Sequence, residues 1–145
     1  MKRIPAIKAL MTPFPYSIAA HAPLREAQEF LQAKHIRHLP VTRDGQLIGM
    51  LTDRDIKLVL GPDFAYPNLS ELTVEEVMLP NAYSIDLNER ADVVLAHMAE
   101  HHVGSALVTR NGKLVGIFTV TDACRSFCEY LREPFEPSGG GDRVA

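Results

Sequence analysis

The chain has 145 residues, of which 46% are hydrophobic, and it carries a formal net charge of −3 at pH 7. This size suits one compact domain or two small lobes that share a core. The small negative charge disfavours binding to nucleic acid or to an anionic membrane surface. No apolar run approaches the length of a membrane span, and no long apolar stretch follows the basic residues at the N-terminus. We therefore expect a cytoplasmic protein without a membrane partner.

The chain contains one segment twice. Residues 11–56 align without a gap on residues 78–123, at a shift of 67 positions, and 14 of the 46 aligned pairs are identical. A repeat of this length indicates two copies of one supersecondary unit. Because each copy alone is near the size at which a single core becomes marginal, we expect the two copies to bury their apolar faces against each other.

The first copy is expected at residues 11–61, after a lead-in at residues 1–10. It starts with a short extended piece, Tyr16-Ser-Ile18, which is followed by an amphipathic helix. The apolar residues of this helix at 3.6-residue spacing are Leu24, Ala27, Phe30 and Leu31. Two extended runs then flank Asp44-Gly45, a pair typical of type I′ hairpins. A second helix is expected to begin at Thr52.

The second copy, residues 78–131, repeats this order after a connector at residues 62–77 that contains two prolines near its start. Its first helix is indicated by Val94, Leu95 and Met98, and its hairpin by Asn111-Gly112. Residues 132–145 contain three consecutive glycines and are expected to form a flexible tail. The predicted fold is thus α/β (α+β): two tandem β-α-β-β-α units related by a pseudo-two-fold axis, with small sheets packed against helices.

Both copies carry the pattern Gly-apolar-apolar-Thr-x-x-Asp where the hairpin meets the second helix, at Gly49–Asp55 and Gly116–Asp122. One interpretation is structural, because Thr at the N-cap and an acid at the third helical position form a capping box. The other is a ligand site. A helix N-terminus offers free N–H groups to a phosphate, and a carboxylate one turn later can accept hydrogen bonds from ribose hydroxyls. Both roles can hold at once.

Two such units in register, together with His35-Ile-Arg-His-Leu-Pro-Val41, resemble a pair of CBS domains, a Bateman module, over about residues 8–131. The resemblance implies a regulatory module that is not an enzyme. It also implies an adenosine-containing ligand, such as AMP, ADP, ATP or S-adenosylmethionine, bound in clefts between the repeats. The nucleotide would be a regulatory ligand rather than a cofactor. The resemblance further implies a homodimer and leaves room for an effector protein that the sequence does not name.

In such modules each cleft joins the first two strands of one repeat to the Thr-x-x-Asp of the other. Carried onto this chain, the resemblance implies two nucleotide-binding groups. One comprises Ser17, Ile18, Ile36, Arg37, His38, Thr119, Thr121 and Asp122. The other comprises Ser84, Ile85, Val103, Gly104, Ser105, Thr52, Arg54 and Asp55. The apolar members would sandwich the adenine, and backbone groups near 36–38 and 103–105 would contact its edge.

The two groups differ in charge and size, so we expect unequal ligand preference. Arg37 and His38 in the first copy correspond to Gly104 and Ser105 in the second. Arg54 lies between Thr52 and Asp55, where a guanidinium is suited to a phosphate. We therefore predict two sites of one kind that are not equivalent.

Two rival functions remain open on the sequence. In the first, the repeats build a dimerisation or interaction scaffold, and the Thr-x-x-Asp pairs are only helix caps. In the second, His97 and His101, at the i, i+4 spacing of metal pairs, bind a metal ion. We expect no metal site, because surface or capping roles suit these histidines at a helix end. Cys124 and Cys128 are expected to be reduced thiols, since helical geometry four residues apart rarely suits a disulfide.

Overall fold

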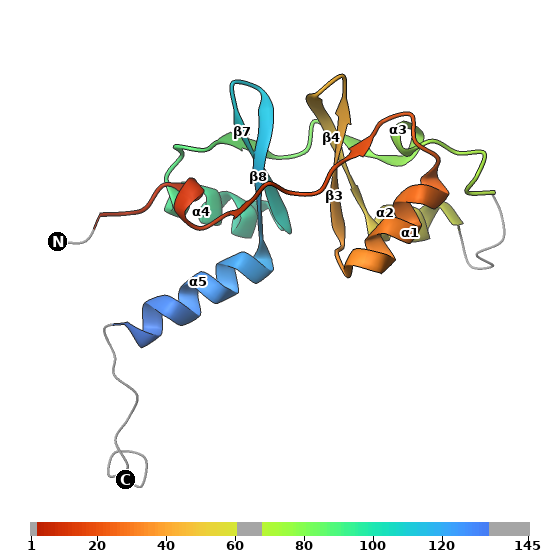
Figure 1. Cartoon of the computed structure of the whole chain (residues 1–145). Coiled ribbons are helices and arrows are strands. Elements are labelled where there is room, and N and C mark those ends of the chain that lie inside the picture. Colours follow the sequence, from red (N-terminus) through yellow and green to blue (C-terminus); the bar gives the residue numbers. More distant parts are fainter. Residues whose placement is uncertain (1–2, 61–67, 134–145) are drawn as a thin grey trace, which may run out of the picture.

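A computed structural model describes residues 3–60 and 68–133 (Figure 1). The expected connector between the copies lies partly outside the described residues, as does the tail from residue 134 onward. The elements of the lead-in and the first copy are η1 (Ile7–Ala9), β1 (Thr12–Pro13), β2 (Ile18–Ala19), α1 (Leu24–Lys34), β3 (His38–Arg43), β4 (Gln46–Thr52) and α2 (Asp53–Leu60). Those of the connector and the second copy are α3 (Val74–Val77), β5 (Leu79–Pro80), β6 (Ser84–Asp86), α4 (Ala91–His101), β7 (Ser105–Arg110), β8 (Lys113–Thr119) and α5 (Val120–Arg132).

The β-α-β-β-α order predicted from the repeat is confirmed in both copies. β3 and β4 form an antiparallel hairpin, as do β7 and β8. Both turn residues have positive φ in each hairpin, 51° and 79° at Asp44-Gly45 and 52° and 78° at Asn111-Gly112, as a type I′ turn requires. One residue that the helical spacing predicted to be in the core is not buried. Leu95 is exposed, because Val94 and Met98 already define the buried stripe of α4 and Leu95 lies one position beside it.

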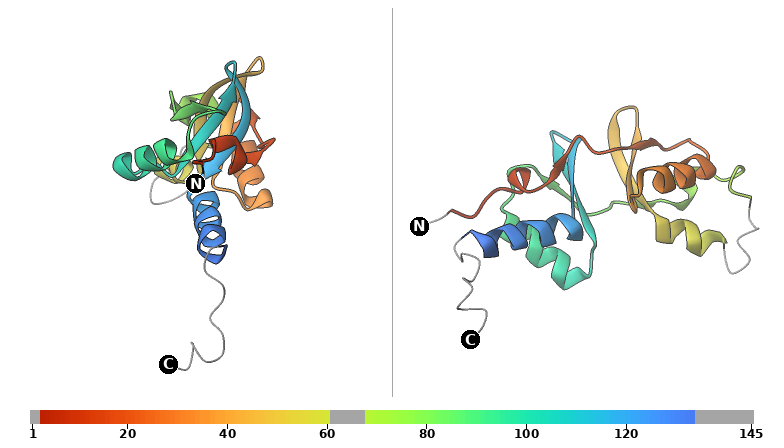
Figure 2. Two further views of the ribbon diagram at one scale, coloured as in Figure 1. Left: turned by 90° about the vertical axis from the view of Figure 1, so that its left-hand side faces the viewer. Right: turned by 60° about the horizontal axis from the view of Figure 1, so that its bottom comes forward.

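Each repeat completes the sheet of the other. The two sheets have the orders β2-β3-β4-β5 and β1-β8-β7-β6, so that β5 joins the first sheet and β1 joins the second. The exchange extends into the cores. Ile7 is fully buried in the core of the second repeat, and Val74, its equivalent at the 67-residue shift, is fully buried in that of the first. The described parts of the lead-in and the connector, residues 3–10 and 68–77, therefore belong structurally to the opposite lobe (Figures 1 and 2).

The glycine of each Gly-apolar-apolar-Thr-x-x-Asp pattern makes room for the exchanged strand. Gly49 pairs with Pro80 of β5, and Gly116 pairs with Pro13 of β1. A Cβ atom on Gly49 would lie 2.7 Å from the carbonyl oxygen of Leu79, a contact that backbone atoms cannot relieve. The φ of Gly49 is not in the left-handed region, so the backbone conformation does not require glycine here. The close approach of the two strands does.

A small third core joins the two sheets. Met50 of β4, Leu107 of β7 and Ile117 of β8 are buried against one another. Met50 and Ile117 are equivalent in the repeat, so the same position of each hairpin meets at the pseudo-two-fold axis. The sequence expectation that the copies bury apolar faces together is confirmed at this junction.

Strand exchange predicts that a residue of the N-terminal segment stabilises the second repeat. Replacing Ile7 by Ala should lower the free energy of unfolding by about 2–5 kcal/mol, because the side chain leaves a cavity in a packed core. The matched control is Ile4→Ala, three residues earlier and 50% exposed, which should change stability by less than about 0.5 kcal/mol. Equal effects of the two variants in urea unfolding would contradict the exchange.

Candidate functional site

Both Thr-x-x-Asp sequences form capping boxes at the start of a helix. In the first repeat the Asp55 N–H donates to Thr52 Oγ1 at 3.1 Å, and the Thr52 N–H donates to Asp55 Oδ2 at 2.9 Å. In the second repeat the Asp122 N–H donates to Thr119 Oγ1 at 3.3 Å, and the Thr119 N–H donates to Asp122 Oδ2 at 2.9 Å. Such boxes satisfy amide groups that a helix leaves unpaired. The structural interpretation of the motif is therefore present in both copies.

The two carboxylates differ in their remaining partners. Asp122 is only 4% exposed, and its Oδ1 atom accepts from Thr12 Oγ1 at 2.9 Å and from Arg125 Nη1 at 3.0 Å. Its Oδ2 atom also accepts from Thr119 Oγ1 at 3.2 Å. A buried carboxylate needs such donors, because burying an unpaired charge is costly. Asp55 is half-buried, and its Oδ1 atom has no hydrogen-bond partner among the described residues.

The repeat explains this difference by sequence. At the 67-residue shift, Thr12 corresponds to Leu79 and Arg125 corresponds to Leu58. Both leucines are exposed and neither has a group that can donate a hydrogen bond. Thr12 and Arg125 were not among the predicted site residues. The signal for both is in the alignment of the repeats beyond the shared motif, where each of them corresponds to a leucine in the other copy.

The predicted strand residues lie beside the Thr-x-x-Asp of their own repeat. His38 is the register partner of Thr52, and the Asp53 N–H donates to the Arg37 carbonyl at 3.1 Å. The second repeat has the same arrangement: Ser105 pairs with Thr119, and the Val120 N–H donates to the Gly104 carbonyl at 3.2 Å.

The two predicted groups meet where His38 lies against Gly104. A Cβ atom on Gly104 would be 3.4 Å from His38 Cε1, so the first repeat reaches the second at this point. Within residues 3–60 and 68–133, no hydrogen bond or ion pair joins Arg37 or His38 to Asp122. His38 and Gly104 are thus one point at which the two predicted groups approach each other.

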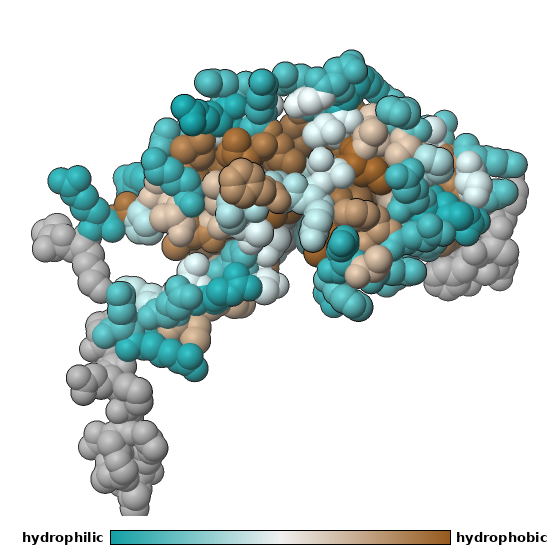
Figure 3. Space-filling model, in the orientation of Figure 1, coloured by the Kyte–Doolittle hydropathy of each residue, from teal (hydrophilic) through white to brown (hydrophobic). Residues whose placement is uncertain are grey.

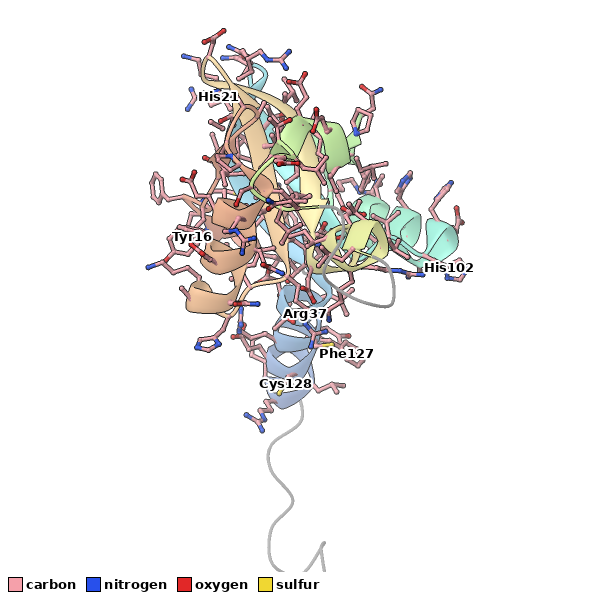
Figure 4. All side chains as sticks on the ribbon, turned by 90° about the vertical axis from the view of Figure 1, so that its right-hand side faces the viewer. Tyr16, His21, Arg37, His102, Phe127 and Cys128 are labelled. Carbon is pink, nitrogen blue, oxygen red and sulfur yellow. The ribbon has the colours of Figure 1, made fainter. Side chains whose placement is uncertain are left out.

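The other predicted residues have varied environments. Ile18 is buried in the first core, and Ile36 packs against that core. The Ile36 and Val103 N–H groups donate to the carbonyls of Leu31 and Met98, so these two amides are already used to end α1 and α4. Ser17, Ser84, Arg54 and Thr121 are exposed, and Ile85 packs against the second core. In Figure 4, Arg37 lies toward the end of the body from which α5 projects.

The histidines of α4 form a ring stack. His97 lies between Tyr83, with ring centroids 3.8 Å apart, and His101, at 4.1 Å. In the described part of the chain, no three His, Cys, Asp or Glu side chains gather as they would around a metal ion. In the same part, no helix is long and apolar enough to span a membrane.

The fold and the doubled motif define a class of paired β-α-β-β-α repeats, and comparison with known proteins identifies the family. The family model for the CBS domain matches residues 7–61 and 74–129, so the chain belongs to the CBS domain family. Both matches begin at the exchanged segments, at equivalent residues of the repeat.

Several relatives are similar over most of their length. Hypoxic response protein 1 of Mycobacterium tuberculosis is 34% identical over 117 residues, which is 78% of each chain. The crystal structure of the CBS domain pair of protein MJ0100, in complex with 5′-methylthioadenosine and S-adenosyl-L-methionine, matches with a TM-score of 0.77 and 26% identity, covering 88% of this chain and 99% of that one. The structure of Hypoxic Response Protein I with two coordinated zinc ions matches with a TM-score of 0.70 and 30% identity, covering 83% and 97% of the two chains.

His38 gives the junction a pH dependence. Its pKa lies below the usual 6.5 because burial and the neighbouring Arg37 guanidinium oppose the charged form more than Asp55 favours it. The unfolded chain then binds the proton more readily, so the folded state loses stability as the pH falls through about 6.5. We expect His38→Asn to reduce the loss of unfolding free energy between about pH 8 and about pH 5. Urea unfolding of both proteins at the two pH values measures this loss.

The control for this prediction is His21→Asn, because His21 is exposed. That variant should keep the wild-type loss of stability on acidification. If His38→Asn also lost as much stability on acidification as the wild type, the assignment of the pH dependence to His38 would be contradicted.

Proposed function

We propose that the chain is a regulatory module that binds an adenosine-containing ligand where its two CBS repeats meet and signals occupancy to a partner protein. The observation that carries the proposal is the Thr-capped helix start that the repeated pattern forms at equivalent places of the two repeats, in α2 and in α5. A helix start presents N–H groups and a positive dipole end to a phosphate. Where a carboxylate on the same turn keeps an oxygen without a protein donor, that oxygen can accept from ribose hydroxyls.

The charges near α2 suit this ligand class. Arg37 and Arg54 are exposed, so both guanidinium groups are available to a phosphate. His38 adds a buried Nδ1 atom without a hydrogen-bond partner among the described residues. The 5′-methylthioadenosine and S-adenosyl-L-methionine bound by the CBS domain pair of MJ0100 support the adenosine part of the proposal.

Signalling would follow from the position of the site. A ligand held by residues of both repeats binds more tightly to the arrangement in which those residues converge, and it shifts the population toward that arrangement. The shift is limited by the difference in affinity between the two arrangements. An effector protein that recognises one arrangement would then sense the ligand. On this proposal the nucleotide regulates and the chain catalyses no reaction on it.

We also propose a homodimer formed through α5. The helix extends away from the sheets (Figures 1 and 2), and Phe127 is 60% exposed. Leu60, the equivalent residue of α2, is buried in the first core. Val120, Tyr130 and Leu131 are exposed on the same helix. In the view of Figure 3 the visible side of α5 is mostly hydrophilic, and apolar patches lie on the body above it. An apolar face repeated in each copy can cover itself across a two-fold axis.

Adenine nucleotides are expected to stabilise the protein by mass action. At about 100 times its dissociation constant, a ligand specific for the folded state raises the free energy of unfolding by about 2.7 kcal/mol. We expect a rise in Tm with at least one of AMP, ADP, ATP and S-adenosylmethionine, and none with inorganic phosphate at equal ionic strength. Failure of all four to bind below about millimolar concentration in calorimetry would overturn the proposal and favour the ligand-free scaffold.

Sedimentation velocity tests the dimer. The wild type should sediment as a dimer at micromolar concentration, and Phe127→Glu should shift it to monomer because a charge would be buried at the interface. Phe14→Glu is the control, since Phe14 is 93% exposed on the turn after β1 and should leave the dimer intact. A monomeric wild type would refute this assignment of α5.

A further inference from the structure

Resting on the proposed function, we infer that the module takes one adenosine ligand per chain, with its ribose on Asp55, and that Asp122 is a fixed structural carboxylate. The two acids occupy equivalent positions of the repeat, and both cap their own helix through Oδ2. They differ in whether the Oδ1 atom is free to receive a ligand.

The Oδ1 atom of Asp122 is already occupied. Thr12 Oγ1 and Arg125 Nη1 donate to it at 2.9 Å and 3.0 Å, and the residue is almost fully buried. A ribose hydroxyl would have to displace one of these donors, and that exchange replaces one hydrogen bond by another without net gain. Displacing Thr12 would also disturb β1, whose strand pairing with β8 completes the second sheet.

The Oδ1 atom of Asp55 has no such competitor. At the 67-residue shift, the equivalents of Thr12 and Arg125 are Leu79 and Leu58. Neither leucine side chain can donate a hydrogen bond to Asp55. Asp55 is half-buried, so a ligand can reach it while the Thr52 N–H keeps its Oδ2 in place. A charge-assisted hydrogen bond from a ribose hydroxyl is then gained without breaking a bond within the protein.

A second observation marks the same place. The Nδ1 atom of His38 is buried and has no hydrogen-bond partner among the described residues, although buried polar atoms in folded proteins are nearly always paired. His38 lies next to Thr52 in the sheet and within electrostatic range of Asp55. Its neighbour across the junction is Gly104, on which a Cβ atom would lie 3.4 Å from the Cε1 atom of the ring. A ligand group that pairs with His38 Nδ1 would remove an unsatisfied polar atom.

Calorimetric titration of the full chain with 5′-methylthioadenosine tests the inference, because this nucleoside has the ribose hydroxyls and no phosphate. We expect one equivalent per chain. Asp55→Asn, which preserves the helix cap, should weaken binding at least about tenfold, since it removes the charge from the hydrogen bond. Asp122→Asn should keep the dissociation constant within about threefold of the wild type.

A second variant keeps the test decisive if Asp122→Asn does not fold. Leu58→Arg combined with Leu79→Thr gives Asp55 the two donors that Asp122 has, and both leucines are exposed, so the fold should tolerate the change. This variant should bind at least about threefold more weakly, and unchanged affinity would overturn the inference. Two equivalents in the wild type, or a loss in Asp122→Asn equal to that in Asp55→Asn, would also overturn it. If neither the nucleoside nor any nucleotide binds, the proposed function itself fails.

Discussion

The exchange of short segments between the repeats is the constraint on which the rest of the structure depends. Each sheet has an edge strand from the opposite copy, and each core contains a residue, Ile7 or Val74, from the opposite copy. Neither repeat can therefore complete its own core, which agrees with the marginal stability expected of a unit this small. Met50 and Ile117 pack in a core that joins the two hairpins, and α2 and α5 begin directly where β4 and β8 end.

The same exchange makes the two motifs unequal. Because β1 crosses to the second sheet, Thr12 reaches Asp122, and its bond adds a polar link to the strand pairing. β5 crosses in the equivalent way, but it carries Leu79 and leaves Asp55 with a free oxygen. The same sequence pattern thus has a structural role in the second copy and is a proposed ligand contact in the first. The helix caps are present in both copies.

Most of the fold could be predicted from the sequence, because the repeat, the Asp-Gly and Asn-Gly turns and the helical spacing are local signals. The partner of each edge strand could not, since two residues such as Thr12-Pro13 carry no pattern that specifies which sheet they join. The helix-capping role of the motif could also be predicted, and it is confirmed in both copies. Its hydrogen-bonding state depends on Arg125 and on strand exchange, which are long-range or lie outside the motif. The assignment of individual residues to a nucleotide remains a prediction.

The most direct test of the account is a crystal structure of the full chain grown with AMP. We expect nucleotide at the junction of the repeats, with a ribose hydroxyl within hydrogen-bond distance of Asp55 Oδ1 and with the Thr12 to Asp122 bond intact. Nucleotide bound against Asp122 with Thr12 displaced, or bound away from the starts of both α2 and α5, would contradict it.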